Sequence, residues 1–326
     1  MTTPTYSLQA PKAVVMVRPH FFASNPATMQ DNAFQTTRPG ESAQAIAAAA
    51  HHEVSVMADQ LAAAGIRVHL FEDQSDATPD SVFPNNWFST HAGGHVAIYP
   101  MYATSRQNER RSDIIQTLKQ TYRVQDVIDY SGLEQDGIYL EGTGAMVLDH
   151  LNRVAYAVRS NRADPLALER FCTHFNFEPM VFDAVDSAGR AVYHTNVLMC
   201  IATDFAMVGL DMISDPQRRA EVQDRLAENG RLVIPLTARQ IAEFAGNAIE
   251  LQGAHGRVLA LSSRALRALT QEQIALICQS AELLALDVPT VELAGGSVRC
   301  MLAGIHLTAR PALNPSFAST RKPNVS

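Results

Sequence analysis

The chain has 326 residues, of which 47% are hydrophobic and 18% charged, and its formal net charge is −7. This composition favours a soluble α/β enzyme of one large or two small domains. The acidic balance, without a basic stripe, argues against nucleic acid or an anionic membrane as a partner. No apolar run is long enough to span a bilayer, the N-terminus lacks a secretory signal pattern, and the four cysteines form no CxxC motif. We therefore expect a reduced, cytoplasmic setting.

The predicted elements alternate between strands and helices. A strand at 13–19 is followed by a helix at 42–65 and a second strand at 67–73. Apolar segments that flank a turn predict five strand pairs, the last one weaker, at 86–100, 144–158, 195–210, 247–261 and 296–307. Further helices are predicted between these pairs, at 105–122, 164–175, 215–230 and 270–286. Several of the helices begin with Ser, Asp or Thr, which are favoured N-cap residues.

The spacing of the strand pairs is regular. They begin near residues 86, 142, 194, 246 and 295, so that consecutive starts lie 56, 52, 52 and 49 residues apart. A hairpin-plus-helix unit that recurs at this interval favours a radial repeat architecture, and the alternative is an ordinary mixed α/β sheet. No linker divides the chain. We expect one catalytic domain over 1–310 and a polar tail over 311–326 that is frayed or serves as an oligomer arm.

Unusual polar residues stand at the starts of the strand pairs, in "FPNNWF", "LEGTGAM", "YHTNVLM" and "GGSVRCM". In a radial repeat, equivalent ends of the units meet near one axis. Asn86, Glu141, His194 and Cys300 are therefore expected to converge.

Cys300 has two interpretations. Free cysteine is among the most buried residue types, so a thiol that fills the core is the common case. A glycine pair precedes Cys300, however, and glycine permits the tight turn that presents a reacting group. Cys172, Cys200 and Cys278 lie in apolar patterns and are expected to be core residues.

His194 and Glu141 also have two interpretations each. His194 is either a capping residue at a strand start or a base beside a thiol, where it holds the thiolate and transfers protons. Glu141 either caps backbone N–H groups or binds N–H donors of a substrate. No metal is expected, because the histidines show neither the HExxH pattern nor Cys/His ligand spacing. No phosphate loop and no cofactor motif is present.

Together these motifs resemble the guanidino-group-modifying enzymes, or pentein superfamily, and most of all the citrulline-utilization hydrolases of the CtlX type. The resemblance covers the chain from "MVRP" to "GIHL" and rests on "VFPNNWFSTH", "LEGTGAMVLD", "YHTNVLM" and "GGSVRCMLAGIH". It implies a five-fold pseudosymmetric α/β propeller, in agreement with the five strand pairs.

The resemblance also implies roles for individual residues. Cys300 matches the nucleophile, His194 the general acid/base, and Glu141 the carboxylate that binds substrate nitrogen and supports the histidine. Arg106 and Arg162 match positions at which relatives hold the substrate carboxylate, and a bidentate clamp of this kind suits an α-amino acid. For each arginine the alternative is a solvated surface charge.

Two positions depart from the arginine deiminase pattern. Those enzymes carry an aspartate in the first motif and another two residues after the histidine, where this chain has Asn86 and Asn196. An amide offers a donor and an acceptor but no charge, so it suits a neutral ureido group better than a buried guanidinium. We therefore expect citrulline as the substrate, converted to ornithine, carbon dioxide and ammonia through an S-linked intermediate.

Two alternatives remain open. Arginine dihydrolases also use asparagine at the first position, so an arginine deiminase or dihydrolase is one alternative. A non-catalytic, ribosome-binding factor of the same fold is another, although it predicts no cysteine–histidine–carboxylate set. The expected partner is a small citrulline- or arginine-like amino acid, and a homo-oligomer is possible.

Overall fold

Five three-stranded sheets of one pattern make up the structure, a computed structural model that describes residues 7–29 and 31–311. Each sheet has a middle strand that is antiparallel to a short first strand and parallel to a third strand. The crossover between the middle and third strands is helical, as parallel pairing requires. The five-fold propeller that the resemblance implied is therefore confirmed.

The first two units hold the following elements. The first has β15 (Ala303–Gly304), β1 (Ala13–Pro19), α1 (Ala43–Ala63) and β2 (Arg67–Asp73). The second has a 3-10 turn η1 (Pro84–Asn86), β3 (Phe88–His91), β4 (His95–Ile98), α2 (Thr104–Gln107), α3 (Ser112–Thr121) and β5 (Asp126–Asp129).

The other three units follow the same plan. The third has the 3-10 turn η2 (Ser131–Asp136), α4 (Gly142–Ala145), β6 (Met146–Asp149), β7 (Val154–Val158), α5 (Pro165–Phe175) and β8 (Glu178–Phe182). The fourth has α6 (Thr195–Leu198), β9 (Met199–Ile201), β10 (Phe205–Val208), η3 (Leu210–Met212), α7 (Pro216–Ala227), η4 (Glu228–Gly230) and β11 (Leu232–Pro235). The fifth has α8 (Ala238–Ala242), β12 (Ile249–Gln252), β13 (Arg257–Ser262), α9 (Ser263–Ala268), α10 (Gln271–Ile277), β14 (Glu282–Leu286) and η5 (Val291–Ala294).

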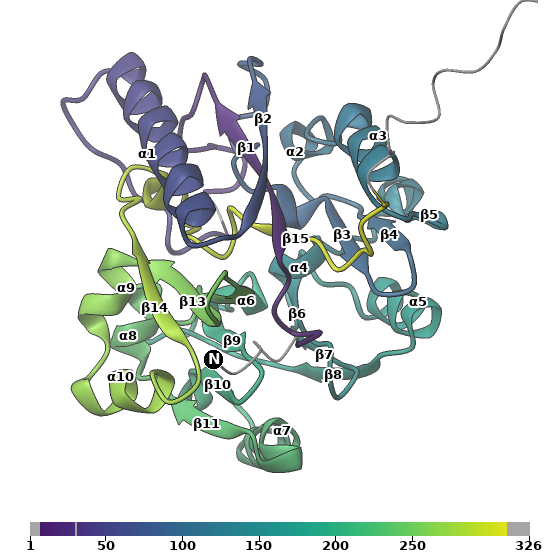
Figure 1. The fold of residues 1–326 in the computed structure, drawn as a ribbon. Helices are drawn as coiled ribbons and strands as arrows, with labels where there is room; N and C mark the ends of the chain where they lie inside the picture. The colour runs from purple at the N-terminus through teal and green to yellow at the C-terminus, as the bar shows by residue number, and fades with distance from the viewer. Residues whose placement is uncertain (1–6, 30, 312–326) are drawn as a thin grey trace, which may run out of the picture.

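The first strands lie at the centre and the long helices at the rim (Figure 1). Around the centre, β15 contacts β3, β6 contacts β9, and β9 contacts β12. Three of the rim helices begin at residues whose side chains accept a backbone hydrogen bond, namely Ser42 for α1, Asp164 for α5 and Asp215 for α7. Their apolar faces pack on the sheets and bury the core between rim and centre.

The last strand corrects one sequence prediction. Residues 296–307 do not form a local hairpin, because β15 pairs antiparallel with β1, Val14 opposite Gly304 and Val15 opposite Ala303. In Figure 1, yellow β15 lies beside purple β1. The fifth strand pair thus joins the two ends of the described chain and closes the ring.

Four smaller predictions were also wrong. The helix expected over 105–122 is broken into α2 and α3, and the second half of 270–286 is strand β14 because its apolar residues continue the sheet. His194 precedes the short helix α6 rather than starting a strand. Cys278 is exposed at the end of α10, whereas Cys172 and Cys200 are buried as expected. The predicted tail, apart from Pro311, lies outside the described residues.

Within the described residues, none of the helices combines the length and the apolar character that crossing a bilayer requires.

Candidate active site

Polar residues stand just before the first strand of each of the five sheets. They are Asn86 before β3, Glu141 before β6, His194 and Asn196 before β9, Asn247 before β12, and Cys300 before β15. All six are buried. Because the first strands surround the centre of the propeller, the five segments bring these side chains to one place.

Cys300 lies in a tight turn that glycine makes possible. Gly295 has a φ of +79°, and an added Cβ there would lie 2.5 Å from the Asn32 side chain, so no other residue fits. The backbone N–H of Cys300 donates to the carbonyl of Ser297 at 2.9 Å. Cys300 is only 2% exposed, so this turn and the surrounding packing fix the position of its sulfur.

Two amides hold the Cys300 sulfur. The Nδ2 atoms of Asn196 and Asn247 each lie 3.2 Å from Sγ and donate to it. Asn247 is itself fixed, since its Oδ1 accepts from the backbone N–H of Arg299 at 3.0 Å. Two N–H donors are good partners for a sulfur that carries negative charge. The Oδ1 of Asn196 is buried and has no protein partner, so it can accept a hydrogen bond from a bound molecule.

His194 and Glu141 form a buried pair. His194 Nε2 lies 2.8 Å from Glu141 Oε2, while Oε1 accepts from the backbone N–H of Tyr102 at 3.0 Å. Burial lowers the pKa of His194 to about 4, against the opposing effect of Glu141, so the imidazole is neutral at pH 7. Burial raises the pKa of Glu141, but the charge of Arg162, the hydrogen bond from His194 and the charge of Arg106 outweigh it and hold that pKa below its usual value.

Arg106 reaches the same pocket but is already paired. Its Nε and NH2 bind the Glu109 carboxylate at 3.0 and 2.9 Å, and its NH1 donates to Asn86 Oδ1 at 3.1 Å. Asp80 Oδ2 lies 3.9 Å from Nε. Burial lowers the pKa of Arg106, yet the carboxylates around it raise it overall, so the guanidinium stays charged. The alternative of a solvated surface charge is excluded for this residue.

Arg162 is buried too, and a residue far away in the sequence binds it. Its Nε donates to Asp31 Oδ2 at 3.1 Å, and its NH1 lies 3.4 Å from Glu141 Oε2. The guanidinium also sits 4.9 Å from the centre of the Tyr193 ring. Asp31 lies between β1 and α1, in a stretch of which the structure describes residues 20–29 and 31–42 and which we call the covering segment. Asp31 thus fills the guanidinium fork of Arg162, for which the resemblance implied a substrate carboxylate as the partner.

The covering segment closes one side of the pocket. Thr28 and Asn32 line it together with Cys300 and His194. Asn32 Nδ2 donates to the carbonyl of Ala294 at 3.1 Å, just before the glycine pair of the Cys300 turn. The covering segment is therefore tied to the turn that holds the Cys300 sulfur.

The structure thus brings together all seven residues that the sequence pointed to, and it adds three. Asn247 was missed, although "FAGNAIEL" occupies the same place in its unit as the other motifs and the repeat spacing marks it. Asp80 lines the pocket with an unpartnered Oδ1, and Tyr193 donates its hydroxyl proton to the Gly295 carbonyl at 2.6 Å. No sequence signal distinguishes Asp80 or Asp31 from surface carboxylates.

This arrangement supports nucleophilic rather than metal chemistry. A thiol, a neutral imidazole and a charged carboxylate share one buried pocket with two arginines, as covalent catalysis on an amino acid requires. Among the described residues, the one cluster of three His, Cys, Asp or Glu with ligand atoms near one another lies elsewhere, at His20, His51 and Glu72.

Comparison with known proteins shows which family and which solved structures this chain is similar to. The sequence model of a family described as "N,N dimethylarginine dimethylhydrolase, eukaryotic" matches residues 18–307. The N-terminal domain of ArgZ, a cyanobacterial arginine dihydrolase, superposes with a TM-score of 0.66 at 15% identity, over 90% of this chain and 97% of that one. AgrE bound to L-arginine superposes with a TM-score of 0.70 at 16% identity, over 92% of this chain and 41% of the AgrE chain. A dimethylarginine dimethylaminohydrolase adduct with S-methyl-L-thiocitrulline superposes with a TM-score of 0.60 at 13% identity, over 90% of this chain and 100% of that one. No curated protein sequence matches.

Proposed function

Because the chain belongs to the N,N-dimethylarginine dimethylhydrolase family, a family of hydrolases within the guanidino-group-modifying superfamily, we propose that it hydrolyses citrulline to ornithine, carbon dioxide and ammonia. It is a hydrolase of carbon–nitrogen bonds other than peptide bonds. The finer assignment to the CtlX-type branch is part of this proposal and rests on the four sequence motifs. The proposed cytoplasmic setting rests on the four cysteines, which form neither a CxxC motif nor a dense framework.

The neutral side chains around the Cys300 sulfur carry the proposal. Asn196 and Asn247 contact Sγ, and Asn86 lies on the Glu141 side of the pocket, with Nδ2 3.5 Å from the Glu141 carbonyl. Two of the nearby carboxylates are already engaged, Glu141 with His194 and Arg162, and Glu109 with Arg106, while Asp80 keeps one free oxygen that we assign to the amino-acid end of the substrate. A buried guanidinium would lack a free ionic partner at the sulfur, whereas a ureido group needs only hydrogen bonds.

The charged residues suit the amino-acid end of the substrate. Arg162 offers its guanidinium group to a substrate carboxylate once Asp31 leaves, whereas the fork of Arg106, the other predicted carboxylate ligand, is already filled by Glu109. The free Oδ1 of Asp80 can accept from an ammonium group. Binding then exchanges one carboxylate for another on Arg162, as Asp31 leaves and the substrate arrives. The covering segment moves in the same step, since Asp31 is part of it.

The proposed reaction has two stages. His194 takes the proton of Cys300, the sulfur bonds to the ureido carbon, and protonated His194 gives the proton to the departing ornithine nitrogen. The C–N bond breaks and a carbamoyl group stays on sulfur. Neutral His194 then removes a proton from water, whose oxygen bonds to the carbamoyl carbon and displaces the sulfur, and His194 returns the proton to that sulfur. Carbamic acid is released and decays to ammonia and carbon dioxide. Glu141 stabilises the positively charged imidazole in each stage.

Substrate assays test the proposal. Purified protein is incubated with citrulline, arginine, agmatine and dimethylarginine, and ornithine, citrulline, ammonia and dimethylamine are measured. We expect ornithine and ammonia in equal amounts from citrulline. Citrulline from arginine would indicate a deiminase, ornithine with twice as much ammonia a dihydrolase, and dimethylamine the activity for which the family is named. Each of these results without citrulline turnover would contradict the proposal.

The nucleophile is tested by substitution. Cys300→Ala should lower turnover of citrulline at least about a thousandfold, because removal of a covalent nucleophile costs that much or more. Cys278→Ala is the matched control, since that thiol is exposed on α10, outside the pocket. Turnover of the Cys300→Ala protein at the wild-type rate would favour the alternative of a pentein-fold protein that does not use this cysteine.

A further inference from the structure

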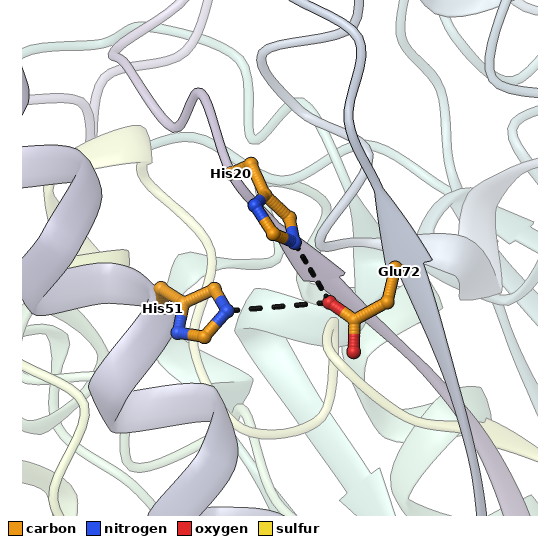
Figure 2. A group of neighbouring side chains, drawn as sticks. All are labelled: His20, His51 and Glu72. Atoms are coloured by element: carbon orange, nitrogen blue, oxygen red, sulfur yellow. Dashed lines mark hydrogen bonds and ion pairs between the residues drawn. The ribbon is translucent and has the colours of Figure 1, made fainter.

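A second group of chemically competent side chains lies away from the Cys300 pocket. His20 follows β1, His51 is on α1 and Glu72 is on β2, and their ligand atoms all lie within 4.8 Å of one another. Figure 2 shows both imidazoles directed at one carboxylate oxygen. The three positions are far apart in the sequence, so no ligand-spacing motif could reveal them.

The distances are close to those of a coordination sphere. His20 Nε2 lies 2.9 Å from Glu72 Oε2, and His51 Nε2 lies 4.0 Å from the same oxygen. Zinc–ligand bonds of about 2.0–2.1 Å at tetrahedral angles place neighbouring ligand atoms about 3.3 Å apart. The two imidazole rings meet edge to face, at 77°, so they do not stack on each other. A small rotation of the side chains is enough to bring the three atoms around one ion.

Arg18 orients the carboxylate of this group. Residues 18 and 72 face each other in the parallel pair β1–β2, and the Arg18 guanidinium makes its shortest contact with Glu72 Oε1. Its NH1 also donates to Ser55 Oγ on α1 at 3.0 Å. Both imidazoles face the other oxygen, Oε2. Arg18 Nε donates to Oε2 as well, at 3.1 Å, so Arg18 fixes the orientation of the carboxylate but shares the ligand oxygen with the ion, which makes the site weaker than a closed structural zinc site.

We propose that His20, His51 and Glu72 bind one divalent transition-metal ion of the zinc class. Two imidazoles and a carboxylate are the donor set of Zn²⁺, Co²⁺ or Ni²⁺, whereas Ca²⁺ and Mg²⁺ prefer oxygen ligands alone. The three side chains are 35–39% exposed and His20 and His51 border a surface hollow, so water completes the coordination and the ion has a path of entry. The site is independent of the hydrolase function proposed above.

The position of the site defines what the ion does to the protein. His20 lies at the start of the covering segment, and His51 lies on α1, where that segment ends. A bound ion would join the start of the covering segment, through His20, and helix α1, through His51, to Glu72 on β2. The ion binds the folded chain and not the unfolded one, so it stabilises the fold.

Metal titration tests the proposal. Zn²⁺ is titrated by calorimetry, and Co²⁺ by its absorption spectrum, into the Cys300→Ala protein, which lacks the active-site thiol as a competing ligand. We expect one ion per chain and a higher melting temperature in its presence. His20→Ala and His51→Ala should each weaken binding at least tenfold.

His52→Ala is the matched control, because His52 is the exposed neighbour of His51 and lies outside the cluster. It should bind the metal as the parent protein does. Circular dichroism and melting of each metal-free variant check that it folds. Unchanged affinity in both cluster variants, or an equal loss in His52→Ala, would overturn the site. Neither readout uses catalysis, so the result does not depend on the outcome of the substrate assays.

Discussion

At the scale of single residues, the proposed preference for citrulline depends on Asn86 and Asn196. Asn86 Oδ1 accepts from Arg106, and Asn196 Nδ2 donates to the Cys300 sulfur. Both amides are buried, so replacing either by a carboxylate changes the charge of a region that water cannot screen. The residue type at these two positions is therefore the simplest control over preference for a ureido or a guanidinium group.

Asn86→Asp tests whether the residue type at position 86 sets this preference. The new carboxylate gives a guanidinium the ionic partner that it lacks, while Arg106 can still donate to it. We expect the ratio of kcat/KM for citrulline to kcat/KM for arginine to fall at least about tenfold, which corresponds to about 1.4 kcal/mol. Asn86→Ala is the control, because it removes the amide without adding charge and should gain nothing toward arginine. An unchanged ratio in Asn86→Asp would show that specificity resides elsewhere.

His194 makes a prediction about pH and stability. Its pKa is about 4 in the folded protein, below the ordinary value of 6.5, so between these pH values the unfolded chain binds more protons. The free energy of unfolding therefore falls as the pH drops from 6.5 to 4, by up to about 3 kcal/mol from this residue. His194→Gln should flatten part of that dependence in urea denaturation measured across the window.

Other histidines contribute in the same range. The pKa of His306 is also lowered to about 4 by burial, so the wild-type slope exceeds the share of His194. The difference between the two proteins isolates His194. Parallel curves for wild type and His194→Gln would mean that His194 is not held neutral.

At the scale of elements, the four-residue helix α4 positions the pair formed by His194 and Glu141. Glu141 precedes α4. Gly144 lies within α4, against the side chains of Asn86 and His194 from the two neighbouring units. A Cβ on Gly144 would lie 2.0 Å from Asn86 Nδ2 and 2.9 Å from His194 Nδ1. Neither side chain can keep its place beside even one methyl group.

Gly144→Ala should therefore lower kcat/KM for citrulline at least about tenfold, because displacement of catalytic groups by an ångström has effects of this size or larger. Gly256→Ala is the control, since a Cβ at Gly256, in the β12–β13 turn, meets nothing within 4 Å. Both variants are first shown to fold by circular dichroism. Full activity in Gly144→Ala would show that α4 and its neighbours adjust freely.

At the scale of the whole molecule, the two ends of the described chain hold the ring closed. β15 pairs with β1, and Ile305 and Leu307, which follow β15, are 4% and 8% exposed in the core. Burial of two such side chains contributes about 3–6 kcal/mol, comparable with the entire stability of many domains. The same closure places Cys300 beside Asn196 and Asn247.

Truncation tests this closure and the proposed extent of the catalytic domain. A chain that ends at Leu302 should fail to fold, because it loses β15 and this buried surface. A chain that ends at Pro311 should keep its melting temperature and its activity on citrulline. Normal melting of the shorter chain, or loss of activity in the longer one, would contradict the single domain over 1–310.

The sequence determined most of the local elements and the repeat and, together with the family resemblance, pointed to seven of the site residues. Turn glycines, apolar alternation and N-caps act over a few residues, so the hairpins at Gly93–Gly94 and Gly253–Gly256 were predictable. The regular spacing then marked Asn86, Glu141, His194 and Cys300 as equivalent positions. The amide in place of a carboxylate at Asn86 and Asn196 could also be read directly.

The tertiary structure decided what depends on distant segments. The partner of β15 lies at the other end of the described chain, and no local pattern identifies it. The same holds for Asp31 on Arg162, for Asn247 on the Cys300 sulfur, and for the meeting of His20, His51 and Glu72. These contacts arise because closure of the propeller brings surfaces together, and one sequence records each residue but not which residue it faces.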